Sequence, residues 1–237
     1  ENMEKDINEL VEKLKSFQQQ SVIYAEELKM AHACEEEKYR KLEDTHNSLQ
    51  QVYAETIRVL AEAIDSRSKF TQGHSERVRR YCDLIGQRLY LSDEELKVLD
   101  IAATLHDIGR VGVEQTVWEK PGKLTDTEFE SVKSHSTIGE KMLPPIPFLD
   151  RVAGIVRHHH EKYDGTGYPD CINGENIPLS ARILAVADAF DAMTSERPYR
   201  ERIDPDVAFE EIKSLSGTQF DPMVIEAFIS VWKKMYS

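Results

Sequence analysis

The first 72 residues contain neither glycine nor proline, whereas all 11 glycines and all 9 prolines follow them. Apolar residues in this stretch recur at alternating steps of four and three, and one series keeps a period of seven: Ile7, Leu14, Leu28, Leu42 and Leu49. This spacing is a heptad repeat, typical of a coiled coil. A helix of roughly 60 residues would be about 90 Å long and unstable without a partner. We therefore expect residues 1–55 to form a coiled-coil helix, most simply in a parallel homodimer.

Four polar residues interrupt this apolar series: Ser21, Glu35, Lys38 and Thr45. Such residues weaken a coiled coil but fix its register and its number of strands. The alternative is an amphipathic hairpin folded back on itself, although no turn residue marks a reversal. The chain begins at Glu1 rather than Met, so we expect it to be a fragment whose long helix carries a signal from an upstream domain or simply dimerises the protein.

Composition excludes several functions. The formal net charge is −13, and a general DNA-binding protein would need a basic face. A small anionic ligand stays compatible with this charge, because bound metal cations invert the local field. No apolar run of about 18 residues is present, so no membrane segment is expected, and no apolar signal-peptide region is visible. The separated cysteines Cys34, Cys82 and Cys171 are typical of reduced thiols, which predicts a cytoplasmic protein.

Residues 56–237 are predicted to form an all-α domain. Apolar residues follow helical spacing over 55–65, 76–89 and 93–105, with little of the alternation that indicates strands. Ser92 and Thr125 each precede a glutamate by three residues, which predicts capping boxes at two helix starts. Ser180 is expected to cap a largely buried helix that begins at residue 181.

Seven histidines and aspartates form a spaced series in this domain: His74, His106, Asp107, His135, His159, His160 and Asp188. Only His32, His46 and His158 lie outside it, and we expect no metal at these three. Imidazoles with carboxylates are ligands for divalent metals, and seven of them can hold more than one ion. A two-metal centre would favour hydrolysis of phosphate esters.

Asp188 is the most informative single position in the series. It lies within the apolar stretch 183–190, where a bare carboxylate would cost several kcal/mol to bury. The nearest basic residue, Arg182, is six positions away and faces elsewhere on a helix. A metal ion is therefore the better explanation for this carboxylate.

His106 and Asp107 follow an apolar helix in the same way, and Gly109 is expected to end that helix as a C-cap. The spacing from His74 to His106 allows two helices to pack as a hairpin that brings both imidazoles together.

Several long motifs occur in one order over residues 54–228, and with them the chain resembles the HD-GYP family of bacterial signalling proteins, a branch of the HD phosphohydrolase superfamily. The matching stretches are 73–78, 105–109, 120–125, 159–169, 185–192, 197–200 and 220–222. The resemblance implies an HD-type helical domain and a metal-dependent phosphodiesterase. Its substrate would be cyclic di-GMP, hydrolysed to the linear dinucleotide pGpG and in some relatives to GMP.

The resemblance also implies roles for the individual residues. His74, His106, Asp107 and Asp188 would hold one ion, and Asp107 would bridge to a second ion held by His135, His159 and His160. The metals would most often be iron, with manganese as an alternative.

Tyr168, Arg197 and Arg200 would contact the substrate, and Asp191 would support the site or contact the ligand. A hydroxide bridging the two metals would attack phosphorus, with Arg110 binding a phosphate oxygen.

Two residues depart from the family pattern. Phe70 replaces a glutamate found in relatives with three metals, so we predict two ions per chain. Arg110 replaces the family lysine, which changes the reach and geometry of the charge. Two other functions stay open: a catalytically weak cyclic-dinucleotide receptor that signals through dimer geometry, and an HD phosphohydrolase for another nucleotide such as cyclic GMP-AMP.

Overall fold

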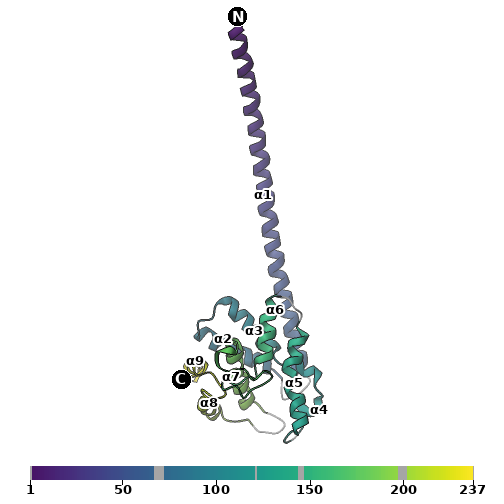
Figure 1. Cartoon of the computed structure of the whole chain (residues 1–237), viewed down its shortest axis with the longest axis vertical. Coiled ribbons are helices and arrows are strands. Elements are labelled where there is room, and N and C mark those ends of the chain that lie inside the picture. Colours follow the sequence, from purple (N-terminus) through teal and green to yellow (C-terminus); the bar gives the residue numbers. More distant parts are fainter. Residues whose placement is uncertain (1, 67–71, 121, 144–146, 197–201, 237) are drawn as a thin grey trace. The chain divides into compact units, whose positions relative to one another are not determined.

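The computed structural model describes residues 2–66, 72–120, 122–143, 147–196 and 202–236 (Figure 1). Its described residues are helical, with only one isolated β-bridge between Ser216 and Phe220, so the predicted all-α class is confirmed. The chain divides into two compact units, Glu1–Tyr53 and Ala54–Ser237. None of its described helices is both long enough and apolar enough to cross a lipid bilayer.

Helix α1 (Asn2–Asp65) is continuous over 64 residues, which excludes the hairpin alternative. Within the first unit its apolar residues are uncovered: Leu14 is 58% exposed, Leu28 71% and Leu42 66%. Leucines this exposed gain nothing from burial in a single chain. The predicted coiled-coil series is therefore available to a partner helix.

The second unit is a bundle of helices. After the end of α1 come α2 (His74–Arg88), α3 (Asp93–Leu105), a 3₁₀ turn (Ile108–Gly112), α4 (Gln115–Trp118), α5 (Asp126–Met142), α6 (Pro147–His158), a second 3₁₀ turn (Gly174–Asn176), α7 (Leu179–Thr194), α8 (Pro205–Ser214) and α9 (Pro222–Tyr236). Helix α2 packs against α3, α7 and α9, and α6 packs against α3 and α5. Fully buried side chains such as Val78, Leu99, Val156 and Leu184 form the core between them.

Both predicted capping boxes are formed, at Ser92 and at Thr125, with reciprocal side-chain and backbone hydrogen bonds. The cap predicted at Ser180 is wrong. Helix α7 starts two residues earlier than predicted, at Leu179 directly after Pro178, and no side chain caps it. Proline has no backbone N–H group, so a proline directly before a helix leaves one donor fewer that a cap would have to satisfy.

Gly109 is not the C-cap that the sequence suggested. Helix α3 ends at Leu105, and Gly109 lies within the following 3₁₀ turn. A Cβ atom at Gly109 would stand 1.9 Å from the carbonyl oxygen of His135. Glycine is therefore needed because the 3₁₀ turn lies directly against α5, and this contact brings the end of α3 beside His135.

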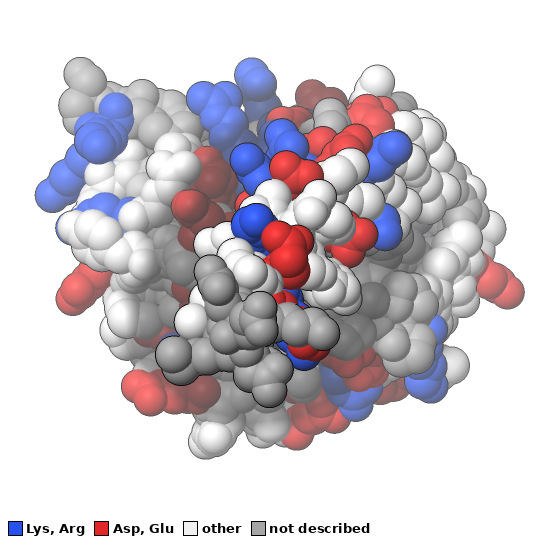
Figure 2. All heavy atoms as spheres, turned by 90° about the horizontal axis from the view of Figure 1, so that it is seen from above, with Lys and Arg blue, Asp and Glu red and all other residues white. Residues whose placement is uncertain are grey.

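Charged side chains are mixed on the surface. Figure 2 shows lysines and arginines interspersed with aspartates and glutamates over the face that it presents. Among the described residues on that face the positive charge is not gathered into one patch, which agrees with the acidic composition.

Candidate metal centre

Six of the seven predicted metal ligands form two compact groups. His74, His106 and Asp107 make up the first group, and His135, His159 and His160 make up the second. Within each group the possible ligand atoms all lie within 4.8 Å of one another. The residues come from α2, from α5 and from the turns that follow α3 and α6, so the fold assembles each group from distant parts of the sequence.

The first group is built where α2, α3 and α7 meet. His74 Nε2 lies 3.2 Å from His106 Nε2 and 3.5 Å from Asp107 Oδ2. Asp188, the seventh predicted ligand, reaches this group from α7, with Oδ1 3.3 Å from His74 Nε2. The helix pair α2 and α3 does bring both imidazoles together, as their spacing indicated.

The second group lies on the other side of Asp107. His135 Nε2 is 3.3 Å from His159 Nε2, and the rings of His159 and His160 have centroids 4.0 Å apart. Asp107 directs Oδ2 to the first group, whereas its Oδ1 lies 3.6 Å from His135 Nε2. The Asp107 carboxylate thus stands between the two groups, with one oxygen toward each.

Hydrogen bonds on the opposite ring nitrogen orient these imidazoles. In His106, His135 and His159, Nδ1 lies 2.6–2.8 Å from the carbonyl oxygen three residues earlier. A carbonyl only accepts, so Nδ1 carries the proton, and Nε2 presents its lone pair to the centre of the site. His74 follows the same scheme with a carboxylate, because its Nδ1 donates to Asp191 Oδ2 at 2.7 Å.

Asp191 lies behind His74 and is only 1% exposed. Its second oxygen accepts from Arg77 Nε at 2.6 Å. Of the two roles predicted for Asp191, this geometry favours support of His74 over contact with a ligand. The sequence reasoning missed Arg77, although it lies one helical turn after His74, where a cation can share the carboxylate that binds the histidine.

The first group concentrates negative charge. Burial raises the pKa of the Asp107 carboxyl, but Arg110 and His106 outweigh burial and hold this pKa well below its usual range. Burial likewise raises the pKa of Asp188, and His74 more than reverses the effect. Burial lowers the pKa of His74, but the three surrounding aspartates raise it to about 10. These carboxylates therefore favour a positive charge among them, which a protonated His74 or a bound metal ion would supply.

The second group is neutral at physiological pH. Burial lowers the pKa of His135 and places that of His159 well below its usual range. Burial, together with His135, lowers the pKa of His160 to about 3. Neutral imidazole is the form that binds a metal.

One buried atom supports the fit of a metal. Asp107 Oδ2 is shielded from solvent and has no hydrogen-bond partner among the described residues. A buried carboxylate oxygen without a partner is costly unless a cation satisfies it. Together with the nitrogen and oxygen donors around it, this atom fits a divalent ion, and the His/Asp groups could hold one.

Arg110 lies at the same carboxylate. Its Nε is 2.7 Å from Asp107 Oδ1, and its guanidinium carbon stands 4.4 Å from the centre of the Trp118 ring. The Trp118 ring also packs edge-on against His135, with centroids 5.5 Å apart. Trp118 gave no signal in the sequence, because a single tryptophan is more often a packing residue than part of a site.

Tyr168 packs its ring against His160, with centroids 4.9 Å apart, and against the edge of Phe129. Burial raises the pKa of the Tyr168 hydroxyl, which stays protonated as a donor. Of the other predicted residues, Phe70, Arg197 and Arg200 lie outside the described residues, so the predictions that rest on them stay predictions.

Neither His/Asp group includes His32, His46 or His158. His158 Nε2 pairs with Asp170 at 2.8 Å, and His32 and His46 are exposed on α1.

Comparison with known proteins identifies relatives over the same residues. A family model described as HD domain matches residues 58–224. The cyclic di-GMP phosphodiesterase response regulator RpfG of Xanthomonas campestris is 41% identical over 185 residues, covering 77% of this chain and 49% of that protein. The 3′3′-cGAMP-specific phosphodiesterase 3 of Vibrio cholerae is 41% identical over 194 residues, covering 80% of this chain and 41% of that protein.

A crystal structure of a cyclic GMP-AMP specific phosphodiesterase (V-cGAP3) from Vibrio cholerae superposes with a TM-score of 0.61 at 25% identity. The match covers 76% of this chain and 48% of that one. The chain thus spans about half or less of the length of these relatives.

Proposed function

Because the chain belongs to the HD domain family, in its HD-GYP branch, we propose that it is a metal-dependent phosphodiesterase that hydrolyses cyclic di-GMP. The position of Asp107, with one carboxylate oxygen toward each histidine group, is the observation that carries this proposal. RpfG, named a cyclic di-GMP phosphodiesterase, supports the substrate. The product would be linear pGpG, with further hydrolysis to GMP as a second step.

We propose two divalent ions per chain, iron or manganese. His74, His106 and Asp188 would hold one ion, and His135, His159 and His160 would hold the other. Asp107 would serve both ions. When bound, the ions would lower the pKa of a water molecule and stabilise negative charge on the phosphoryl oxygens.

The remaining residues would bind and orient the substrate. Arg110, held between Asp107 and the Trp118 ring, would direct its other guanidinium nitrogens to a phosphate oxygen. Tyr168 would present its ring to a guanine base or donate its hydroxyl to a phosphate. Arg197 and Arg200 are further proposed contacts to the phosphates.

Cyclic GMP-AMP is the second candidate substrate. The V. cholerae phosphodiesterase 3, which is 41% identical to this chain as RpfG is, is named specific for 3′3′-cGAMP. The solved structure is also of a phosphodiesterase named specific for cyclic GMP-AMP. A catalytically weak receptor is the third candidate, since Arg110 stands where the family has lysine.

Turnover by the full chain separates these functions. Metal-free protein is loaded with Mn²⁺, or with Fe²⁺ without oxygen, and is incubated with cyclic di-GMP, 3′3′-cGAMP or cyclic di-AMP, and the products are resolved by chromatography. We expect His106→Ala and Asp107→Ala to lower kcat by at least about 10²-fold. His158→Ala is the matched control, because His158 adjoins the ligands but bonds Asp170 instead.

Each result has a definite meaning. Cleavage of cyclic di-GMP with the highest kcat/KM supports the proposal, and preference for 3′3′-cGAMP supports the second candidate. Binding of a cyclic dinucleotide without hydrolysis by metal-loaded protein would support the receptor. Three ions per chain at full occupancy would contradict two-metal binding.

We further propose that the chain forms a parallel homodimer through the apolar series of α1. The exposure of Leu14, Leu28 and Leu42 supports this assembly. Because the relatives are about twice as long, an upstream sensory domain is part of the proposal. A cytoplasmic location is also proposed, supported by three cysteines without disulfides.

A further inference from the structure

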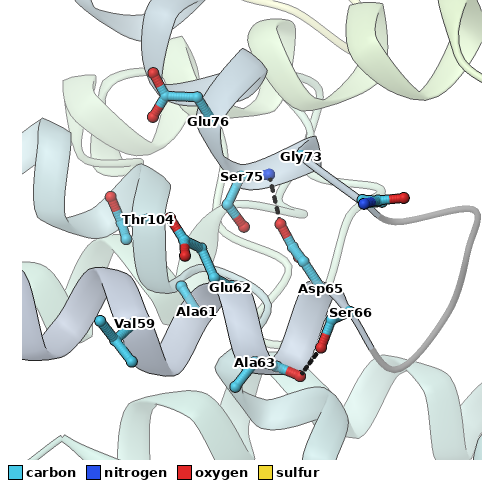
Figure 3. Close-up of a pocket in the computed structure, with 11 residues that line it drawn as sticks. Val59, Ala61, Glu62, Ala63, Asp65, Ser66, Gly73, Ser75, Glu76 and Thr104 are labelled. Atoms are coloured by element: carbon cyan, nitrogen blue, oxygen red, sulfur yellow. Dashed lines mark hydrogen bonds between the residues drawn. The ribbon is translucent and has the colours of Figure 1, made fainter.

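Asp65, the last residue of α1, is joined to α2 by a hydrogen bond. The backbone N–H of Ser75 donates to Asp65 Oδ2 at 3.0 Å (Figure 3). Asp65 is buried, with only 6% of the residue exposed. A charged acceptor away from water makes a stronger hydrogen bond than a neutral one.

Helix α2 has no cap of its own. The residue before its first turn is Gly73, at φ +69°, and no side chain caps the helix from that position. The first amides of a helix lack intrahelical partners, and a negative charge near them is favourable. Asp65 therefore caps α2 from the end of a different helix.

The capped turn carries a proposed metal ligand. Ser75 directly follows His74, so the amide that Asp65 holds is adjacent to that histidine in the chain. On the α7 side, Asp191 binds both His74 Nδ1 and the Arg77 guanidinium. The first turn of α2 is thus fixed by one carboxylate from α7 and one from α1.

Packing leaves space at this junction. A cavity of about 550 Å³ lies beside Asp65 and is lined mainly by small or polar residues, among them Ala61, Ala63, Ser66 and Thr104. Figure 3 shows these side chains around the Asp65–Ser75 bond. An unfilled space contributes few dispersion contacts, and beside it the Asp65–Ser75 hydrogen bond joins α1 to α2.

We propose that Asp65 is a positioning residue that ties the end of α1 to the first turn of α2 and thereby holds His74 in place for the first metal ion. This inference rests on the metal centre of the proposed function. It also couples α1 to the site, because a displacement of the end of α1 would act on Ser75, the residue next to the proposed ligand His74.

Metal titration of the full chain tests the proposal. Metal-free wild-type, Asp65→Ala, Asp65→Asn and Glu62→Ala proteins are titrated with Mn²⁺ by calorimetry, and the step lost in His106→Ala identifies the first group. We expect Asp65→Ala to weaken that step about tenfold and to leave the other step unchanged. Asp65→Asn keeps an acceptor oxygen and should recover most of the affinity, while Glu62→Ala, in the same cavity, should stay within about twofold.

The proposal would be wrong if Asp65→Ala bound the first Mn²⁺ ion with wild-type affinity. It would also be wrong if both Mn²⁺ steps weakened equally, because that result indicates a general loss of structure. Thermal unfolding of each metal-free variant shows that it is folded before titration. The proposed function can fail separately: if metal-loaded wild type hydrolyses no cyclic dinucleotide, the two Mn²⁺ steps still report on Asp65.

A second comparison tests the part of α1. Ile57 is 6% exposed on α1, two turns before Asp65, so Ile57→Ala loosens the end of the helix. We expect this change to weaken the first Mn²⁺ step in wild type and to add nothing in the Asp65→Ala background. If the two substitutions weaken the first Mn²⁺ step additively, the position of α1 does not act through Asp65, and the proposed link between α1 and His74 is wrong.

Discussion

Replacing Asp191 by asparagine should weaken the first metal site without removing any of its ligands. Asp191 accepts from His74 Nδ1 at 2.7 Å and from the Arg77 guanidinium at 2.6 Å. Asparagine has the same shape but only one acceptor oxygen, so it can satisfy one of these donors and must turn an NH₂ group to the other. The charged Arg77 guanidinium competes more strongly for the remaining oxygen, so the His74 ring loses the bond that fixes its proton on Nδ1 and its lone pair on Nε2.

The expected effect follows from what the carboxylate holds. Loss of such an orienting partner typically lowers metal affinity 10–100-fold, or about 1.4–2.7 kcal/mol. The folding stability should fall less than for a fully buried ion pair, because the Arg77 side chain is 40% exposed and water can solvate it. We expect about 1–2 kcal/mol from the lost hydrogen bond and the weakened ion pair.

The assay is a Mn²⁺ titration of metal-free protein, with thermal unfolding measured in parallel. Asp221→Asn is the matched control, because Asp221 is 3% exposed and paired with Arg182 but contacts no proposed ligand. We expect the control to lose stability and keep its metal affinity. If Asp191→Asn binds both ions as tightly as wild type, or if Asp221→Asn weakens binding equally, Asp191 does not position His74.

Three further results follow from the structure. Gly109→Ala should destabilise the protein by more than about 3 kcal/mol, since its Cβ would stand 1.9 Å from the His135 carbonyl oxygen, whereas Gly154→Ala has no atom within 4 Å and should keep the wild-type Tm. Removal of metal by a chelator should lower Tm by about 5–10 °C relative to protein with metal at about 100 times Kd, and an unchanged Tm would argue against a bound ion. Deletion of residues 1–50 should leave a folded domain that dimerises more weakly, and light scattering that shows undiminished dimers would place the main contact outside α1.

Periodicity was enough to predict α1, α2 and α3, because a helix places apolar residues at a fixed spacing on the face that packs against the core or a partner. The long α1, the all-α class and both capping boxes depend on residues that are close together in the sequence. The two errors have different causes. Ser180 matched the chemistry of a cap, but Pro178 had already set the start of α7, and Gly109 matched a helix end although its real constraint is the approach of α5.

The proposed metal ligands were visible for a different reason. Asp188 is a carboxylate in an apolar helix, so its residue type and its surroundings disagree, and that disagreement shows in one sequence. Arg77 and Trp118 carry no such conflict, since an arginine on a helix or a tryptophan at the end of a short helix is ordinary. Their part depends on the direction of each side chain, which only the fold supplies. The Asp65–Ser75 bond is hidden in the same way.

Charge links metal binding to the choice between enzyme and receptor. The chain carries a net charge of −13, and the first group gathers three buried or partly buried aspartates around His74. The described arginines nearby already face carboxylates, Arg77 at Asp191 and Arg110 at Asp107. A cyclic dinucleotide has two phosphates, so the metal-free site repels it, and two divalent ions would reverse the sign of the field. Enzyme and receptor therefore both need metal to bind the nucleotide, and only product formation by the metal-loaded protein distinguishes them.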